Sequence, residues 1–342
     1  MNYHAQSVFI EGLGFVRRLL NWFLVVTLAL GGWAYWWVNQ ALDLTAPTLD
    51  LSIEPGTTPR GVAQAAVDAG VQTSPALLYW WFRLSGQARL IKAGSYELET
   101  GLSPHALLSK ITRGEESLRS VTLVEGWNFK QVRAALSKAE HLTPDTQGLE
   151  ANLIMQKLGQ ADLQPEGRFF PDTYTYAKGS SDLAVLQRAM RAMDHHLAAV
   201  WQLRSTNTPL KTPEDLLTLA SIVEKETGRA SDRPMIASVF SNRLRIGMLL
   251  QTDPTVIYGM GDKFDGNLRR RDLLTDTPWN TYTRAGLPPT PIAMPGKASL
   301  LAAAQPATSS ALYFVARGDG TSQFSDDLNA HNRAVNKYQR GQ

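Results

Sequence analysis

The sequence of 342 residues contains no cysteine. This fits an exported chain without a disulfide framework. Because no HExxH motif occurs either, zinc proteolysis lacks its usual ligands. Neither a G-x-S-x-G motif nor a Walker motif is present. The pattern shows no cluster of metal-binding residues, so we expect neither a metal nor another cofactor.

The chain also has little excess charge of either sign. The formal net charge of +3 is too small to argue for a nucleic-acid partner, and no RNA- or DNA-binding signature occurs. The basic run Arg269–Arg271 is short and local. Hydrophobic residues make up 44% of the chain and charged residues 19%, so most of it should be globular. Its length suits one membrane segment and about two domains.

A long uncharged stretch lies at residues 19–38, LLNWFLVVTLALGGWAYWWV. Its length suits a helix that spans about 30 Å of hydrocarbon, and the tryptophans near its end are typical of a membrane interface. The arginines at 17–18 predict a cytoplasmic N-terminal tail and an external remainder. A cleaved signal peptide is the alternative, but its apolar region would be shorter and followed by small residues. We therefore predict an uncleaved single-pass transmembrane helix.

The rest of the chain predicts an α+β protein with two modules. Residues 1–18 are the expected tail, and residues 39–50, after the membrane helix, are a linker. Residues 51–118 are typical of a strand, two helices, a second strand and a third helix, with a Pro-Gly turn near the start. Residues 119–342 are expected to form a larger mixed α/β domain.

In this larger domain, helices are predicted at residues 129–138, 147–159 and 181–203. The segment PEGRFFPDTYTY, residues 165–176, lies between them and is aromatic, proline-rich and not periodic. Two interpretations of it are open: a loop that plugs an edge of the core, or a loop whose aromatic faces stack on sugar rings. A hairpin at YFVARGDGTSQFS and a terminal helix that carries His331 complete the pattern.

The region with the most helix-start, helix-end and loop signals begins at Thr212. Thr212 is a predicted helix N-cap, and Pro213 fits the first helical position. Gly228 is expected to end this helix, and a second helix is expected from Ser231 to Gly247. The next two segments, LQTDPTVIYGMG and PWNTYTRAGLPPTPIAMPG, are rich in glycine and proline and are predicted to be loops.

Glu226 is the acid of the first helix that is best suited to chemistry. At about 100° per residue, the apolar residues define a core direction, and Glu226 lies about 50° from it while Glu224 lies about 110° from it. We therefore expect Glu226 to be the more buried acid. Burial raises the pKa of a carboxylic acid and keeps it protonated near neutral pH, as a general acid requires. A half-buried structural glutamate is the alternative.

The histidines offer less. His195 and His196 are neighbours on a predicted helix, so their rings point apart, and both are expected to be solvated. For His331, a structural hydrogen-bonding role is favoured.

Six stretches together point to one family. They are LVEGWN, EGRFFPDTY, ASIVEKET, ASVFSNRLRIGMLLQTDPTVIYGMG, NTYTRAGLPPTPIAMPG, and YFVARGDGTSQFS followed by HN. In this order they strongly resemble the endolytic murein transglycosylases, the MltG or YceG-like family.

The resemblance implies a bitopic inner-membrane protein with a small LysM-like module at 51–118 and a periplasmic catalytic domain at 119–342. It also implies cleavage of the β-1,4 bond between N-acetylmuramic acid and N-acetylglucosamine within nascent peptidoglycan strands, which leaves 1,6-anhydromuramic ends and limits strand length. Association with peptidoglycan synthases is a further implication. The LysM-like module departs from a full repeat in length, which leaves its glycan binding open.

The family's catalytic glutamate matches the second glutamate of the EKE motif, which is Glu226 here, in agreement with the helix-face argument. Most glycosidases use two carboxyl groups. Here the resemblance implies that one suffices: Glu226 protonates the leaving glycosidic oxygen and then, as a carboxylate, accepts the proton of the muramic acid 6-hydroxyl that attacks its own anomeric carbon.

Further substrate-binding residues follow from loop position and the resemblance. They are Glu224, as a partner of Glu226, together with Gln251, Thr252, Asp253, Tyr258, Asn280 and Tyr282. For each loop residue the alternative is loop architecture, and for Asp253-Pro254 a turn or helix cap is as well supported as substrate contact. Arg243 could pair with a carboxylate of the cleft or of peptidoglycan, or form a structural salt bridge.

Two other functions are open at this point. A noncatalytic, membrane-tethered peptidoglycan-binding scaffold would bind glycan without cleaving it. A hydrolytic muramidase would need a second carboxylate, for which Asp253 is the best-placed residue, and would leave reducing ends in place of anhydro ends.

Overall fold

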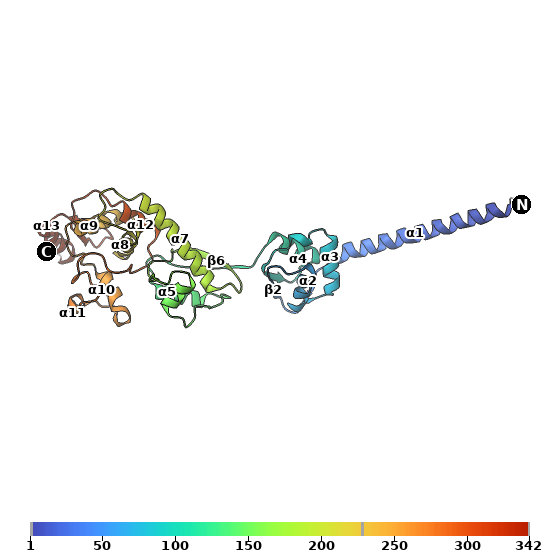
Figure 1. Cartoon of the computed structure of the whole chain (residues 1–342), viewed down its shortest axis with the longest axis horizontal. Helices are drawn as coiled ribbons and strands as arrows, with labels where there is room; N and C mark the ends of the chain where they lie inside the picture. Colours follow the sequence, from blue (N-terminus) through green and yellow to red (C-terminus); the bar gives the residue numbers. More distant parts are fainter. Residues whose placement is uncertain (1–2, 227–228, 341–342) are drawn as a thin grey trace. The chain divides into compact units, whose positions relative to one another are not determined.

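The computed structural model describes residues 3–226 and 229–340. Gly228, which was expected to end a helix, and residues 1–2 of the predicted tail lie outside the described residues. The chain divides into two compact units, Met1–Leu118 and Arg119–Gln342. Both units combine helices with short strands, which confirms the α+β class (Figure 1).

The first unit holds four helices and four short strands among its described residues. In chain order the elements are α1 (Tyr3–Asn39), β1 (Asp43–Leu44), β2 (Thr48–Ile53), α2 (Pro59–Asp68), β3 (Val71–Gln72), α3 (Pro75–Leu84), the 3₁₀ turn η1 (Ala88–Leu90), β4 (Gly94–Glu99) and α4 (Pro104–Arg113).

The predicted order of strand, helix, helix, strand and helix is confirmed by β2, α2, α3, β4 and α4. Strands β2 and β4 pair antiparallel, with Leu51 opposite Tyr96, and alternate residues of β2 are buried as the period of a strand requires. Thr58 caps α2 by accepting the N–H of Gly61 at 3.2 Å. The identity of this unit as a LysM-like module stays a prediction.

Residues 19–38, the predicted transmembrane helix, belong to α1. Within the part of the chain that the structure describes, however, none of the helices combines the length and the apolar character needed to cross a membrane. The structure therefore does not support the predicted transmembrane helix.

The second unit is larger. Its elements are β5 (Leu118–Thr122), α5 (Phe129–Lys138), α6 (Ala151–Lys157), β6 (Thr173–Ala177), α7 (Asp182–Gln202), α8 (Pro213–Glu226), α9 (Arg233–Arg245), α10 (Asp253–Met260), the 3₁₀ turn η2 (Gly261–Lys263), α11 (Arg270–Leu274), α12 (Lys297–Ala304), β7 (Tyr313–Ala316), β8 (Ser322–Ser325), α13 (Leu328–Val335) and the π-helical turn η3 (Asn336–Arg340). Strand β5 pairs with β6, and β7 pairs antiparallel with β8 as the predicted hairpin.

Helix α7 joins two hydrophobic cores in this unit. Its first half, with Val185 and Ala189, packs among residues of α5, α6, β5 and β6. Its second half, with Leu197 and Val200, packs among residues of α8, α9 and α12. Figure 1 shows α7 extending from the region of α5 and β6 to that of α8 and α12. The long helix thus fixes the second core, which carries α8, against the first.

Helix α8 lies inside the second core. Its predicted start is confirmed, because Thr212 accepts the N–H of Asp215 at 3.1 Å. All residues from Leu216 to Val223 are buried, as expected for a helix covered on every side. Neighbouring segments therefore decide which of the acids at its end is covered, and the helix face alone does not.

The aromatic segment at 165–176 contains a strand that was not predicted. Residues Thr173–Ala177 form β6, and Tyr174 and Tyr176 are buried. Phe169 and Phe170 are buried as well, and the hydroxyl of Tyr174 donates to the carbonyl of Phe170 at 2.7 Å. These rings belong to the cores, so the structure favours the core plug over a sugar-stacking loop.

The segment predicted as the loop LQTDPTVIYGMG contains helix α10. Pro254 occupies the first helical turn, where its missing N–H breaks no helical hydrogen bond. The hydroxyl of Thr255 donates to the carbonyl of Thr252 at 2.8 Å across the start of the helix. The Asp-Pro pair thus forms the first two residues of the helix, directly after the N-cap residue Thr252, and the substrate contact that the sequence left open for Asp253 stays a prediction.

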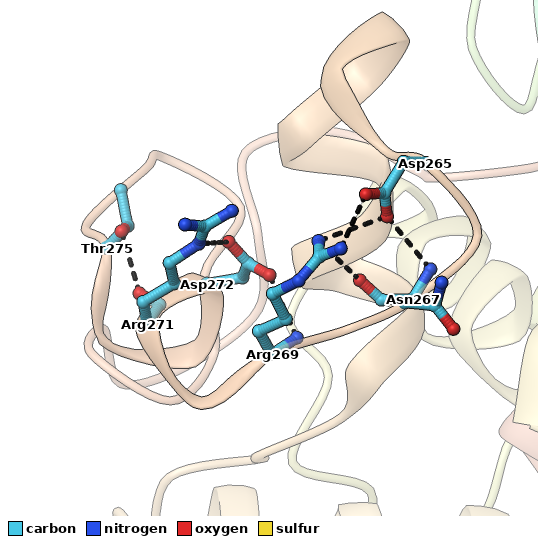
Figure 2. Close-up of polar contacts among 6 residues, drawn as sticks. All are labelled: Asp265, Asn267, Arg269, Arg271, Asp272 and Thr275. Atoms are coloured by element: carbon cyan, nitrogen blue, oxygen red, sulfur yellow. Dashed lines mark hydrogen bonds and ion pairs between the residues drawn. The ribbon is translucent and has the colours of Figure 1, made fainter.

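The arginine run at residues 269–271, which leads into α11, has local acidic partners. Figure 2 shows the guanidinium of Arg269 facing the carboxylate of Asp265, with a shortest separation of 2.7 Å. The Nε of Arg271 lies 3.6 Å from the carboxylate of Asp272, which also accepts the backbone N–H of Arg269 at 2.8 Å. This part of the run therefore stabilises a loop and the start of a short helix.

Candidate active site

A cavity of about 420 Å³ opens at the C-terminal end of α8. Residues from α8, α9, α10, β7, α13 and the loops beside them surround it. Its lining consists of Glu226, Arg243, Leu250, Gln251, Asp253, Tyr282, Tyr313, Phe314, Leu328, His331 and Asn332. Four of the predicted site residues are therefore brought together: Glu226, Gln251, Asp253 and Tyr282.

Glu226 is the last residue of α8 and is partly buried. Burial raises the pKa of its carboxyl group above the ordinary range, and the nearby charge of Asp253 raises this pKa further. The hydroxyl of Thr252 donates a hydrogen bond to Oε1 of Glu226, and Arg243 lies close enough to act on it. Both lower the pKa of Glu226, less than burial raises it. The site thus favours a protonated carboxyl group and retains partners for its carboxylate form.

A strained bend places Thr252 against Glu226. Gln251 has a φ of 49°, a left-handed conformation that is uncommon for residues other than glycine. Its N–H donates to the carbonyl of Thr281 at 3.1 Å, and the N–H of Thr252 donates to the hydroxyl of Thr281, also at 3.1 Å. The loop around Thr281 therefore fixes the bend, and α10 begins directly after it.

Asp253 and Tyr282 meet at the edge of the cavity. The hydroxyl of Tyr282 donates to Oδ1 of Asp253 at 2.6 Å. Burial, and then this bond to Asp253, raise the pKa of Tyr282, which keeps the phenol protonated. The pair presents oxygen atoms suited to hydrogen bonds with hydroxyl groups of a ligand.

Arg243 is the main residue of the cavity that was not in the predicted set. Its side chain is buried in α9, and its guanidinium donates to the carbonyls of Leu312 and Leu250, each at 2.7 Å. Within the described residues no carboxylate lies at ion-pair distance from it, in contrast to the predicted salt bridge. It also lies over the ring of Tyr313, with 5.3 Å from Cζ to the ring centroid.

His331 and Asn332 bring α13 to the cavity. The ring of His331 stacks on Tyr313 with 5.1 Å between the ring centroids, and its Nδ1 is buried without a hydrogen-bond partner in the described structure. Burial, and then the charge of Arg243, lower the pKa of His331, so it is neutral near pH 7. The HN motif was the signal for both residues in the sequence, but the motif alone did not indicate which cavity they line.

Tyr258 and Asn280 do not reach the cavity. The hydroxyl of Tyr258 donates to Glu166 at 3.1 Å. Asn280 is fully buried, and its amide nitrogen donates to the carbonyls of Leu273 and Thr275 at 3.0 and 2.7 Å. These hydrogen bonds give both residues an architectural role, and the substrate contact proposed for them stays a prediction.

Glu224 is not a neighbour of the cavity either. Its side chain is only 6% exposed and lies 3.3 Å from the guanidinium of Arg233, which is 11% exposed. The other carboxylate oxygen accepts the N–H of Gly296 at 2.9 Å, at the start of α12. The helix-face argument expected burial of Glu226, which the structure bears out, but it did not anticipate that α9 and the loop before α12 cover Glu224 as well.

Glu166 is a further buried acid that sequence reasoning missed. Its carboxylate accepts the N–H of Phe129 and the hydroxyl of Tyr258, each at 3.1 Å. Burial raises its pKa from 4.5 to about 7, against these hydrogen bonds. Within the described residues no group of three or more His, Asp or Glu side chains is arranged to hold a metal ion.

The shift at Glu166 predicts a pH dependence of stability. Between the unfolded pKa of 4.5 and the folded pKa of about 7, the folded state keeps a proton that the unfolded state has lost. The free energy of unfolding therefore falls as the pH rises through this interval, by about 3 kcal/mol from this group. We expect Glu166→Gln to remove that component, measured as the difference in urea unfolding between pH 5 and pH 8. An equal pH dependence in the variant and in the control Glu150→Gln would contradict the expectation.

The sequence and the fold of this chain are similar to those of known proteins. The chain matches the YceG-like family over residues 51–337. The endolytic murein transglycosylase of Bacillus subtilis strain 168 is 31% identical to it, over 85% of each chain. That of Streptococcus pneumoniae D39 is 25% identical, over 94% of this chain and 65% of its own length. A crystal structure of a YceG-like protein from Listeria monocytogenes is similar with a TM-score of 0.52 and 27% identity, over 84% of this chain and 98% of its own.

Proposed function

This chain belongs to the YceG-like family, and from this premise we propose that it is an endolytic murein transglycosylase, a lyase that cleaves within the glycan strands of peptidoglycan. The names of the relatives in Bacillus subtilis and Streptococcus pneumoniae support this activity. The observation that carries it in this chain is a single glutamic acid, Glu226, whose burial beside a cavity favours the protonated form.

The reaction needs one acid that later becomes a base. We propose that Glu226 gives its proton to the glycosidic oxygen, so that the bond from the anomeric carbon of N-acetylmuramic acid to this oxygen breaks and N-acetylglucosamine leaves as an alcohol. The resulting carboxylate then takes the proton of the 6-hydroxyl, whose oxygen bonds to the same anomeric carbon. The product is a 1,6-anhydro end, no water is consumed, and Glu226 is protonated again.

The surroundings of Glu226 suit both halves of this sequence. Burial supports the acid form at the start. When the carboxylate forms, the hydroxyl of Thr252 donates to it, and Arg243 supplies a positive charge nearby. Gln251, Asp253 and Tyr282 line the same cavity, and we propose that they bind hydroxyl and acetamido groups of the sugars.

The hydrolytic alternative has one observation in its favour, because Asp253 lines the same cavity as Glu226. Mass spectrometry of fragments released from uncrosslinked peptidoglycan separates the possibilities. Internal cleavage with anhydromuramic ends supports the transglycosylase, and reducing ends would identify a muramidase that uses water. If the folded protein binds peptidoglycan without cleaving it, the noncatalytic scaffold is the correct function.

Thr252 tests the proposed sequence of proton transfers. A hydrogen bond to a charged group contributes about 1.5–3 kcal/mol, so we expect Thr252→Val to lower kcat/KM by at least about tenfold. Because the hydroxyl lowers the pKa of Glu226, its loss should move the basic limb of the pH profile to higher pH. The pH dependence of anhydro product formation measures both effects, with the exposed Thr206→Val as the control. An unshifted profile would show that the hydroxyl does not act on the catalytic acid.

Location and partners stay predictions. We propose that the catalytic unit works on the periplasmic side of the inner membrane, because nascent peptidoglycan is accessible there, and that its cleavage limits strand length. Attachment through residues 19–38 and association with peptidoglycan synthases rest on the sequence alone. Extraction of membranes with alkaline carbonate tests the attachment, since an integral protein stays in the pellet.

A further inference from the structure

A second cavity lies in the C-terminal part of the second unit. Its volume of about 440 Å³ is similar to that of the cavity at Glu226, about 420 Å³. Its walls come from β8, α13 and η3, and include apolar surface from Phe324 and Ala334 and polar groups from Arg333, Lys337 and Tyr338. The mechanism proposed above uses none of these residues.

The two cavities lie on opposite sides of α13. Leu328, His331 and Asn332 line the cavity at Glu226, whereas Arg333 and Ala334 line the second one. At about 100° per residue, these two sets point in roughly opposite directions from the helix axis. A ligand that occupied both cavities would therefore have to pass over this one short helix.

The protein itself uses the acids at the rim of the second cavity. Asp327 accepts the N–H of Ala330 at 2.8 Å and so caps α13, and Asp326 accepts the hydroxyl of Ser310 at 2.9 Å. Neither lies at ion-pair distance from Arg333 or Lys337 among the described ion pairs.

The cations that line the second cavity are better placed than its acids to bind a ligand. Arg333 and Lys337 are exposed and four residues apart. Lys337 lies over the ring of Tyr338, with 5.0 Å from Nζ to the ring centroid, and Arg317 lies over it as well, at 5.8 Å from Cζ. Two cations, Lys337 and Arg317, thus lie over one phenol ring, and Lys337 and Arg333 line a cavity of ligand size. This arrangement suits a carboxylate ligand with some apolar surface.

Peptidoglycan supplies such a ligand next to the scissile bond. The lactyl group of N-acetylmuramic acid carries a short stem peptide with free carboxylates and small apolar side chains. We propose that the second cavity binds the stem peptide of the muramic acid whose sugar ring occupies the cavity at Glu226, with Arg333 and Lys337 on its carboxylates. This inference rests on the proposed function, because the sugar must lie in the first cavity for the peptide to reach the second.

Binding to an inactive parent tests the inference apart from the activity. The parent is the full chain with Glu226→Gln, and the ligands are uncrosslinked glycan strands with their stem peptides and the same strands after an amidase has removed them. Adding Arg333→Gln and Lys337→Gln should weaken binding of the peptide-bearing strands by about tenfold or more and leave binding of the stripped strands unchanged. The control adds Lys157→Gln and Arg270→Gln, two exposed cations elsewhere in the unit.

Each other outcome overturns the inference. Unchanged binding of both ligands would mean that the cavity takes no stem peptide, as for a cavity that docks a protein partner. An equal loss for both ligands would place the two cations on the glycan backbone. A parent that binds both ligands equally would show that the peptide adds no contact at all. Failure of the proposed function is a separate result, since it would appear as absent cleavage by the unmodified chain while peptide-dependent binding by the parent could persist.

Discussion

Glu226→Gln will abolish the release of anhydromuramic fragments, with a fall in kcat of about 10²–10⁴-fold as for other general acids. Glutamine keeps the shape and can still accept the hydroxyl of Thr252, but it has no proton to give to the glycosidic oxygen. The fold should be retained, because burial raises the pKa of this glutamic acid and so favours the neutral form that glutamine mimics. The expected result is thus a folded protein that binds glycan and does not cleave it.

Mass spectrometry of fragments from uncrosslinked peptidoglycan measures this loss, and thermal unfolding checks the fold. Glu150→Gln is the matched control, since Glu150 is an exposed glutamate of the same unit whose side chain makes no cap hydrogen bond. Persistent anhydro products from a folded Glu226→Gln variant would assign the acid to another residue. A loss of activity together with unfolding in the Glu226→Gln variant alone would make Glu226 a structural acid.

Local chemistry explains what could be predicted about the helix that carries Glu226. Its start follows from the Thr212-Pro213 pair, and the structure shows the expected cap hydrogen bond from Asp215. The raised pKa of Glu226 follows from burial at the end of an apolar helix. The helix start depends on neighbours in the sequence, so capping rules were enough to predict it. Residue periodicity indicated which acid to consider, whereas the groups that surround Glu226 come from distant segments.

Distant contacts explain what the sequence did not indicate. Glu224 is covered because Arg233 and Gly296 approach it from other segments. The amide nitrogen of Asn280 donates its hydrogen bonds to the backbone carbonyls at the end of α11. Arg243 was considered only as a partner in a salt bridge, whereas backbone carbonyls hold it beside the cavity. Side-chain type and spacing fix none of these contacts, because each depends on how α9, α12 and the proline-rich loop pack around α8.

The proline and glycine residues of the segment LQTDPTVIYGMG led to a wrong prediction of a loop where helix α10 lies. Proline disfavours the interior of a helix but is well suited to its first turn, and Pro254 lies in that turn of α10. The bend at Gln251, with a φ of 49°, directly precedes it. The segment therefore combines a fixed bend with a helix start, and together these place Thr252 on Glu226 and Asp253 at the cavity.

The two glutamates of the EKE motif are expected to respond in opposite ways to the same substitution. Glu224 and Arg233 form a buried ion pair, with side chains 6% and 11% exposed. Breaking a buried pair by removing one partner costs about 3–5 kcal/mol, because it leaves an uncompensated charge. Glu125 is near both groups: burial and then the charge of Glu224 raise its pKa, and the charge of Arg233 lowers it, so Glu125 offsets part of this cost. We therefore expect Glu224→Gln to lower the free energy of unfolding of the second unit by about 3 kcal/mol.

A double-mutant cycle with Arg233→Gln makes this expectation specific. If the pair acts as described, removing both partners should cost clearly less than the sum of the two single losses, with a coupling of about 1 kcal/mol or more. Urea unfolding of the full chain measures each free energy, and fragment analysis below the transition measures activity. Since Glu224 holds the start of α12 and not the cavity, the folded fraction of Glu224→Gln should keep cleaving with anhydro ends. If the losses in free energy of unfolding of the two single variants simply add up in the double variant, Glu224 and Arg233 do not stabilise the fold as a pair. A stable Glu224→Gln protein without activity would instead move the catalytic role to Glu224.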